Sequence, residues 1–287
     1  MSKDKTFEKL RQFFRMKKGD VSQLHQKEYF QLTPEIEREI CATDNSIQSR
    51  IKKLRELSEH VLYSHLEEIA IVKIYDHIVD LLRPEVPKEF RCVTFQFMRC
   101  IVQGQYETIV FMRRKIFLLI QTHNIVEDLV QRLELLQTLT KNGIDILHFE
   151  EDIVKFMMNW MKEVVDNNQT TLFLGILVNI IKYNAAHIDE DVLSLLVLNV
   201  CFLVLYKDQS LIPSCLDIFD AVVCYSTMSP EVLPNFIRTF CQLINMHTYS
   251  QTCWKIMKNV LGTHMGHASV HIMCNLLSID PDVQERH

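Results

Sequence analysis

The sequence has little glycine. Its six glycines lie at positions 19, 104, 143, 175, 262 and 266, and no two of them are five residues apart. The phosphate-binding loop GxxxxGK[ST] is therefore excluded, and neither GxGxxG nor GxSxG occurs. Because these motifs of nucleotide binding and of esterase-type catalysis are missing, we expect a protein that is not an enzyme and holds no cofactor.

Paired cysteines and long apolar runs are missing as well. The nine cysteines are an odd number without any CxxC, which is typical of a reducing cytosol, so we expect a cytoplasmic location. The longest apolar run, residues 192–206, includes Ser194 and Asn199 and is shorter than the ~20 residues that cross a bilayer. We interpret this run as a buried helix. The opening MSKDK is followed by more charge, which is unlike a cleavable signal peptide.

Charge is unevenly distributed along the chain. The net charge is -5, but residues 1–18 hold seven Lys or Arg against two acids, so the remainder carries -10. An acidic body argues against nucleic-acid binding, which needs a basic surface to replace phosphate counterions. The segment FEKLRQFFRMKK would place Phe7, Leu10 and Phe14 on one helical face among basic residues. This pattern allows peripheral membrane contact through residues 1–18, while a mobile N-terminal arm or a helix that docks on the acidic body is the simpler interpretation.

From Thr33 onward, apolar residues recur every three or four positions, as in Phe90, Val93, Phe97 and Ile101. This spacing predicts one amphipathic helix after another. Grouped in pairs, the helices start near residues 44, 87, 125, 169, 210 and 250. The resulting period of 38 to 44 residues is typical of helix-pair repeats.

We therefore predict an all-α chain, folded as a HEAT/armadillo-like α-solenoid of about six helix pairs. A compact all-α bundle is the alternative. The predicted organisation is a basic N-terminal arm at residues 1–30, the solenoid at residues 31–280 and a C-terminal tail at residues 281–287.

Histidines gather near the C terminus, in GTHMGHASVHIMC at residues 262–274. His264, His267, His271 and Cys274 have zinc-ligand chemistry, but on one helix the first and last would lie roughly 15 Å apart. A single ion cannot contact all four, so we expect no metal site. We interpret Gly262 as a helix end, Thr263 as the N-cap of the last helix, and the histidines as its outward polar face.

The last two predicted helices offer a candidate partner surface. Lys255, Lys258 and Asn259 lie opposite the apolar side of their helix, which is predicted to be buried and extends from Cys253 to Leu261. With His264 and His267 they form the candidate partner-binding residues. The apolar residues of the last helix span a wide arc. We hypothesise that more chain or a partner covers this arc. The apolar residues of this arc are Ala268, Val270, Ile272, Met273, Leu276 and Leu277.

Several segments of the C-terminal third resemble the N-terminal domain of tuberin, a subunit of the tuberous sclerosis complex. They are DAVVCY at 220–225, the LP that precedes a Phe helix at 233–236, and CWK with NVLGTHMGH at 253–267. Weaker similarity extends back through RPEVP and IVQGQ at 83–105, so that the resemblance covers about residues 80–277.

The resemblance implies a HEAT-like solenoid that binds the coiled coil of hamartin. In the assembled complex, tuberin activates GTP hydrolysis by the small GTPase Rheb and so restrains target-of-rapamycin signalling. Tuberin's catalytic domain lies far toward its own C terminus and is not within these 287 residues, so no catalytic residue carries over. If the chain is part of a longer product, the remainder of a tuberin chain is a further partner.

Two other functions remain as alternatives. One is a generic helical-repeat adaptor that contacts lysosomal or other endomembranes through its basic N-terminal segment. The other is a small metal-dependent enzyme built on His264, His267 and His271.

Overall fold

The computed structural model describes residues 29–41 and 45–279, and within them the chain is helical. The α-helices of this part are α2 (Pro34–Ile40), α3 (Ile47–Tyr63), α4 (Glu68–Ile78), α5 (Lys88–Gly104), α6 (Arg113–Thr122), α7 (Leu129–Leu139), α8 (Glu150–Asp166), α9 (Thr170–Asn184), α10 (Glu190–Tyr206), α11 (Ile212–Tyr225), α12 (Leu233–Ile244), α13 (His247–Leu261) and α14 (Gly266–Ile279). Short 3-10 helices lie at Val79–Leu82, Thr108–Met112, Val126–Asp128, Ala185–His187 and Gln209–Leu211. The predicted basic arm and C-terminal tail lie largely outside the described residues.

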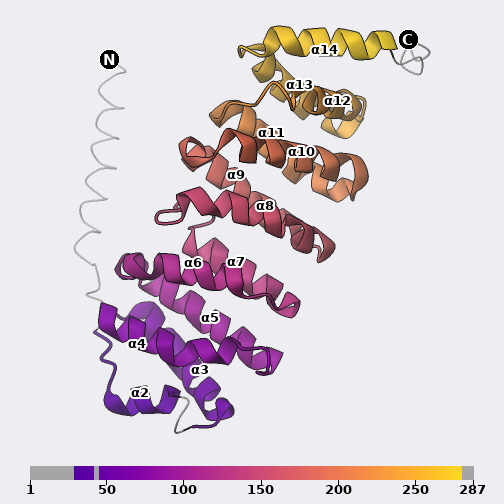
Figure 1. The fold of residues 1–287 in the computed structure, drawn as a ribbon. Helices are drawn as coiled ribbons and strands as arrows, with labels where there is room; N and C mark the ends of the chain where they lie inside the picture. Colours follow the sequence, from indigo (N-terminus) through magenta and orange to yellow (C-terminus); the bar gives the residue numbers. More distant parts are fainter. Residues whose placement is uncertain (1–28, 42–44, 280–287) are drawn as a thin grey trace, which may run out of the picture.

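The helices from α3 to α14 stack as pairs along one axis, with α2 at the first end (Figure 1). The first helices of the pairs, which are α3, α5, α7, α9, α11 and α13, contact one another in succession and form one layer. Among the second helices, α8, α10, α12 and α14 do the same and belong to the other layer. The first helices begin within four residues of the predicted starts, so the predicted all-α solenoid is confirmed and the compact bundle is excluded.

Three buried arginines recur at the same position of successive repeats. Arg50, Arg91 and Arg132 lie on α3, α5 and α7, 41 residues apart. Each arginine forms an ion pair with an acidic side chain. That side chain lies either near the end of the same repeat or just before the first helix of the next repeat. The pairs are Arg50 with Asp80, Arg91 with Asp128 and Arg132 with Glu163. At the next equivalent position the chain has Phe173, which is buried and apolar.

The ion pair of α5 is the most enclosed of the three. Arg91 Nε donates to Asp128 Oδ2 over 2.6 Å, and Nη2 donates to Oδ1 over 3.1 Å. The ring of His123 approaches the same carboxylate, with Nε2 2.8 Å from Oδ2. Burial lowers the pKa of His123 and outweighs the opposing effect of Asp128. The Asp128 carboxylate, in the turn before α7, therefore contacts both α5 and the residue that follows α6.

Two glycines of the repeats lie in opposite environments. A Cβ at Gly104, the last residue of α5, would lie 2.4 Å from the carbonyl oxygen of Val61 on α3, whereas a Cβ at Gly175 in α9 would meet nothing within 4 Å. Gly104→Ala is expected to destabilise the protein by about 2–3 kcal/mol, because a helix backbone has to shift. Gly175→Ala is expected to stabilise it by about 0.5–1 kcal/mol through helix propensity. Urea unfolding followed by circular dichroism would measure both changes, and equal effects of the two substitutions would contradict the expectation.

Candidate interaction surface

Helix α10 has a row of large apolar side chains that face solvent. Leu195, Leu198, Phe202 and Tyr206 are 49%, 37%, 51% and 70% exposed, and they lie three or four residues apart on one side of the helix. The other side of α10 packs on α8, α11 and α12. The prediction that this run forms a buried helix is therefore wrong for one side. A two-layer solenoid covers an outer helix with its neighbours and leaves the remaining side in water.

This row forms one wall of a groove between α10 and α12. The groove has a volume of about 540 Å³ and is open to solvent. It is lined by Leu198, Cys201, Phe202, Leu205 and Tyr206 of α10 and by Asn235, Arg238, Thr239 and Gln242 of α12. The α10 wall is thus apolar, while the exposed side chains of the α12 wall are two carboxamides and one guanidinium.

The groove lining contains one cysteine and one charged side chain. Its one cysteine, Cys201, is buried, and burial raises the pKa of its thiol to about 11. A thiol with such a pKa stays protonated at neutral pH and is a poor nucleophile. Arg238 is exposed and forms no ion pair or side-chain hydrogen bond with any other residue in the described part of the chain.

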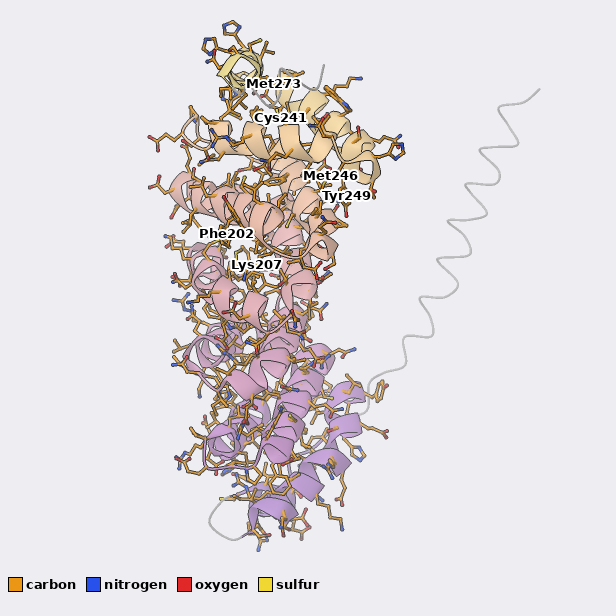
Figure 2. All side chains as sticks on the ribbon, turned by 90° about the vertical axis from the view of Figure 1, so that its right-hand side faces the viewer. Phe202, Lys207, Cys241, Met246, Tyr249 and Met273 are labelled. Atoms are coloured by element: carbon orange, nitrogen blue, oxygen red, sulfur yellow. The ribbon has the colours of Figure 1, made fainter. Side chains whose placement is uncertain are left out.

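Apolar exposure continues beyond the groove along the long axis of the solenoid. Figure 2 shows Phe202 and Lys207 at the end of α10, followed by Met246 and Tyr249 at the turn between α12 and α13. Met246 is 36% exposed and Tyr249 is half-buried. Apolar side chains are thus exposed on α10 and again before α13, with the charged Lys207 at the end of α10.

The predicted partner residues lie on α13, in the turn that follows it and at the start of α14. Lys255, Lys258 and Asn259 project from the outer side of α13, as predicted. Lys255 Nζ lies 3.9 Å from Asp220 on α11, and Asn259 Nδ2 lies 3.6 Å from the sulfur of Cys224. His264 is exposed at the rim of a small pocket of about 180 Å³, and His267 is exposed on α14.

Sequence reasoning missed two apolar residues on the same side of α13. Trp254 is 52% exposed beside Lys255, and Leu261, which was predicted to be on the buried side, is 43% exposed. Exposed tryptophan among basic residues is typical of protein contact surfaces. The signal for Trp254 was available, since it adjoins the predicted lysine in the CWK segment.

The histidine-rich segment turns a corner between α13 and α14. His264, His267, His271 and Cys274 are all exposed, as predicted for an outward face. Within the described residues, no group of three or more His, Cys, Asp or Glu side chains is placed to hold a metal ion. Thr263 is not the N-cap of α14, because the helix begins three residues later, at Gly266. The Thr263 hydroxyl donates to the Val260 carbonyl over 2.7 Å and accepts from the Met265 N–H over 3.3 Å, so it stabilises the turn before the helix.

The predicted apolar arc of α14 is partly covered. Ile272, Met273 and Leu276 pack against the core, while Ala268 and Val270 are exposed. The buried side of the helix includes Ser269, and Met265, just before the helix, is buried as well. That more chain or a partner covers the rest of the arc stays a prediction.

The comparison with protein families matches most of the chain. The model for the domain of unknown function DUF3384 aligns with residues 47–287, from the start of α3 onward. The chain belongs to the DUF3384 family. The match takes in α10, α12 and α13, so both candidate surfaces lie within the family domain.

The fold of this DUF3384 chain is similar to a solved structure of the TSC2 N-terminus, TSC2 being tuberin. The TM-score is 0.76 at 16% sequence identity, over 87% of this chain and 65% of that chain. The similarity confirms a tuberin-like helical solenoid as the fold. The chain spans less than two thirds of the structure that it matches.

Among the described residues of this DUF3384 chain, no helix is both long and apolar enough to cross a membrane.

Proposed function

We propose that this chain is a non-catalytic, tuberin-type scaffold that binds the coiled coil of hamartin. The exposed apolar wall of α10 carries the proposal, because amphipathic helices bind to solenoids and other helical folds by placing their apolar side in such a groove. The fold similarity to the TSC2 N-terminus supports the choice of partner.

The cellular role follows from this assembly. In a complex with hamartin, the scaffold would contribute to the activation of GTP hydrolysis by Rheb and to the restraint of target-of-rapamycin signalling, without supplying a catalytic residue. We propose that the complex acts in the cytoplasm, where it can associate with lysosomal or other endomembranes. The proposed membrane contact of residues 1–18 concerns a segment outside the described residues.

Size-exclusion chromatography with light scattering tests the partner directly. The full chain, mixed with a hamartin coiled-coil fragment at micromolar concentration, is expected to elute as one complex of higher mass than either component. Separate elution of the two proteins at these concentrations would contradict the proposal.

We further propose that the α13 surface contributes to this binding. Changing Lys255 and Lys258 together to Glu is expected to weaken the complex by roughly threefold to tenfold, since exposed charges at an interface mainly tune association. Lys52 and Arg55 on α3 are a matched control pair, exposed and spaced by three residues in the same way. Unchanged affinity of the α13 variant, measured by titration calorimetry, would exclude this surface.

A further inference from the structure

The two walls of the α10–α12 groove differ in polarity, and this difference describes the helix that would fit between them. On α10, Phe202 and Tyr206 lie one helical turn apart and form the apolar wall. On α12, Asn235, Arg238 and Gln242 are spaced by three and four residues, so they form one side of that helix over about 10 Å. A segment lying between them would meet apolar atoms on one side and polar atoms on the other.

Arg238 is the one charged side chain in the lining of the groove. Within the described residues it has no carboxylate partner, unlike Lys255 on α13. A helix that covered the guanidinium without supplying an anion would bury an unpaired cation, which is costly. A helix with a carboxylate at that point would form a charge-assisted hydrogen bond instead.

We propose that the groove selects an acidic amphipathic helix, lying along α10 and α12, whose apolar side packs on Phe202 and Tyr206 and whose acidic residue pairs with Arg238. This inference rests on the proposed helix-binding role of the groove and adds the chemistry of the bound helix. Arg238 is then the residue that determines specificity, while the α10 wall provides most of the contact area.

A free carboxylate with an apolar tail, such as a fatty acid, has related chemistry. The shape of the groove favours the helix, because both walls are sides of α-helices and the groove between them is open to solvent. An open groove leaves the polar side of a bound helix in water, as helix-in-groove complexes do.

The overall charge of the protein makes the test decisive. The chain has a net charge of -5, so long-range electrostatics favours a basic peptide over an acidic one. A preference for the acidic peptide therefore has to come from a local cation. Two synthetic helix-stapled peptides would serve as probes, with identical apolar residues at positions i, i+3, i+4 and i+7 and with either Glu or Lys on the adjacent side.

Fluorescence anisotropy of labelled peptides with the full chain would measure the two affinities. The Glu peptide is expected to bind about tenfold more tightly than the Lys peptide, and the preference is expected to disappear or reverse in Arg238→Glu. Arg55→Glu on α3 is the control, since it changes the net charge equally at an exposed arginine far along the solenoid. It is expected to retain the preference.

Three outcomes would overturn the inference. They are a stronger binding of the Lys peptide, an equal affinity of both peptides, and an Arg238-dependent binding of a fatty acid when neither peptide binds. None of these depends on hamartin, so they are distinct from a failure of the hamartin complex to form. Binding of the hamartin fragment that is lost in Phe202→Asp but unchanged in Arg238→Glu would keep the groove as the site and exclude the acidic contact.

Discussion

Phe202→Asp on α10 is expected to reduce the affinity for the hamartin coiled-coil fragment by about 100-fold, which corresponds to ~2.8 kcal/mol. Phe202 is half exposed at the centre of the apolar wall, and its ring contacts that of Tyr206 at a centroid distance of 5.0 Å. Aspartate would remove this contact area and place a charge where an apolar helix side has to pack. Titration calorimetry of the purified variant against the fragment would measure the loss.

The stability of this variant is expected to stay close to that of the native protein, because Phe202 is exposed before the partner binds. Ile69→Asp provides a matched control. Ile69 is 70% exposed on α4, near the other end of the solenoid, so the same change of chemistry falls far from the groove. If both variants bind as the native chain does, the groove is not the hamartin site. If both lose binding equally, the loss comes from placing a charge on any exposed apolar surface and is not specific to the groove.

Asp128→Asn is expected to lower the free energy of unfolding by about 3–5 kcal/mol. The Asp128 side chain is fully buried, and both of its oxygens accept hydrogen bonds from Arg91. Asparagine keeps the shape but removes the buried negative charge, so the buried Arg91 would keep only the exposed Glu127 carboxylate as a counter-charge. Hydrogen bonding to Asp128 raises the pKa of Arg91, which shows that the pair stabilises its charged form.

Glu127 provides the control for this prediction. It contacts the same guanidinium, at 3.2 Å from Nη2, but its side chain is 65% exposed. Glu127→Gln is therefore expected to change the stability by no more than about 0.5 kcal/mol. Urea unfolding gives both values, and hydrogen exchange should place the loss of protection in α5 and α7. A small effect at both positions would mean that the first repeats do not depend on the buried ion pair.

The period of the solenoid was predictable because its signals are local. Apolar spacing of three and four residues marks each helix, and residues such as Gly104 and Gly262 mark helix ends. On α13 the alternation of Lys255 and Lys258 with Ile256 and Val260 was strong enough to assign both sides of the helix, apart from Leu261.

The exposed wall of α10 was not predictable in the same way. Leu195, Leu198 and Phe202 face water, while Leu196 and Val200 face the core, and all five are apolar. A helix that is apolar on every side contains no local information about which side its neighbours cover. The groove therefore depended on where α12 lies relative to α10.

The buried arginines have one property that is visible in the sequence and another that depends on how the helices pack. The repeat of Arg50, Arg91 and Arg132 at 41-residue spacing is visible in the sequence, although a search for apolar periodicity passes over it. Their burial is not visible, because long charged side chains usually face solvent. Asp128 lies 37 residues from Arg91, and it neutralises that side chain only once α5 and α7 have packed together.

For this protein, the sequence by itself determined the helices, their pairing period and the outward side of α13, since these follow from the spacing of residues along a single helix. Tertiary structure decided which charges are buried as pairs and which apolar side chains remain in water. Both depend on contacts between helices that are distant in the chain. The buried ion pairs of the first repeats and the exposed apolar surface of the later ones are consequences of that packing.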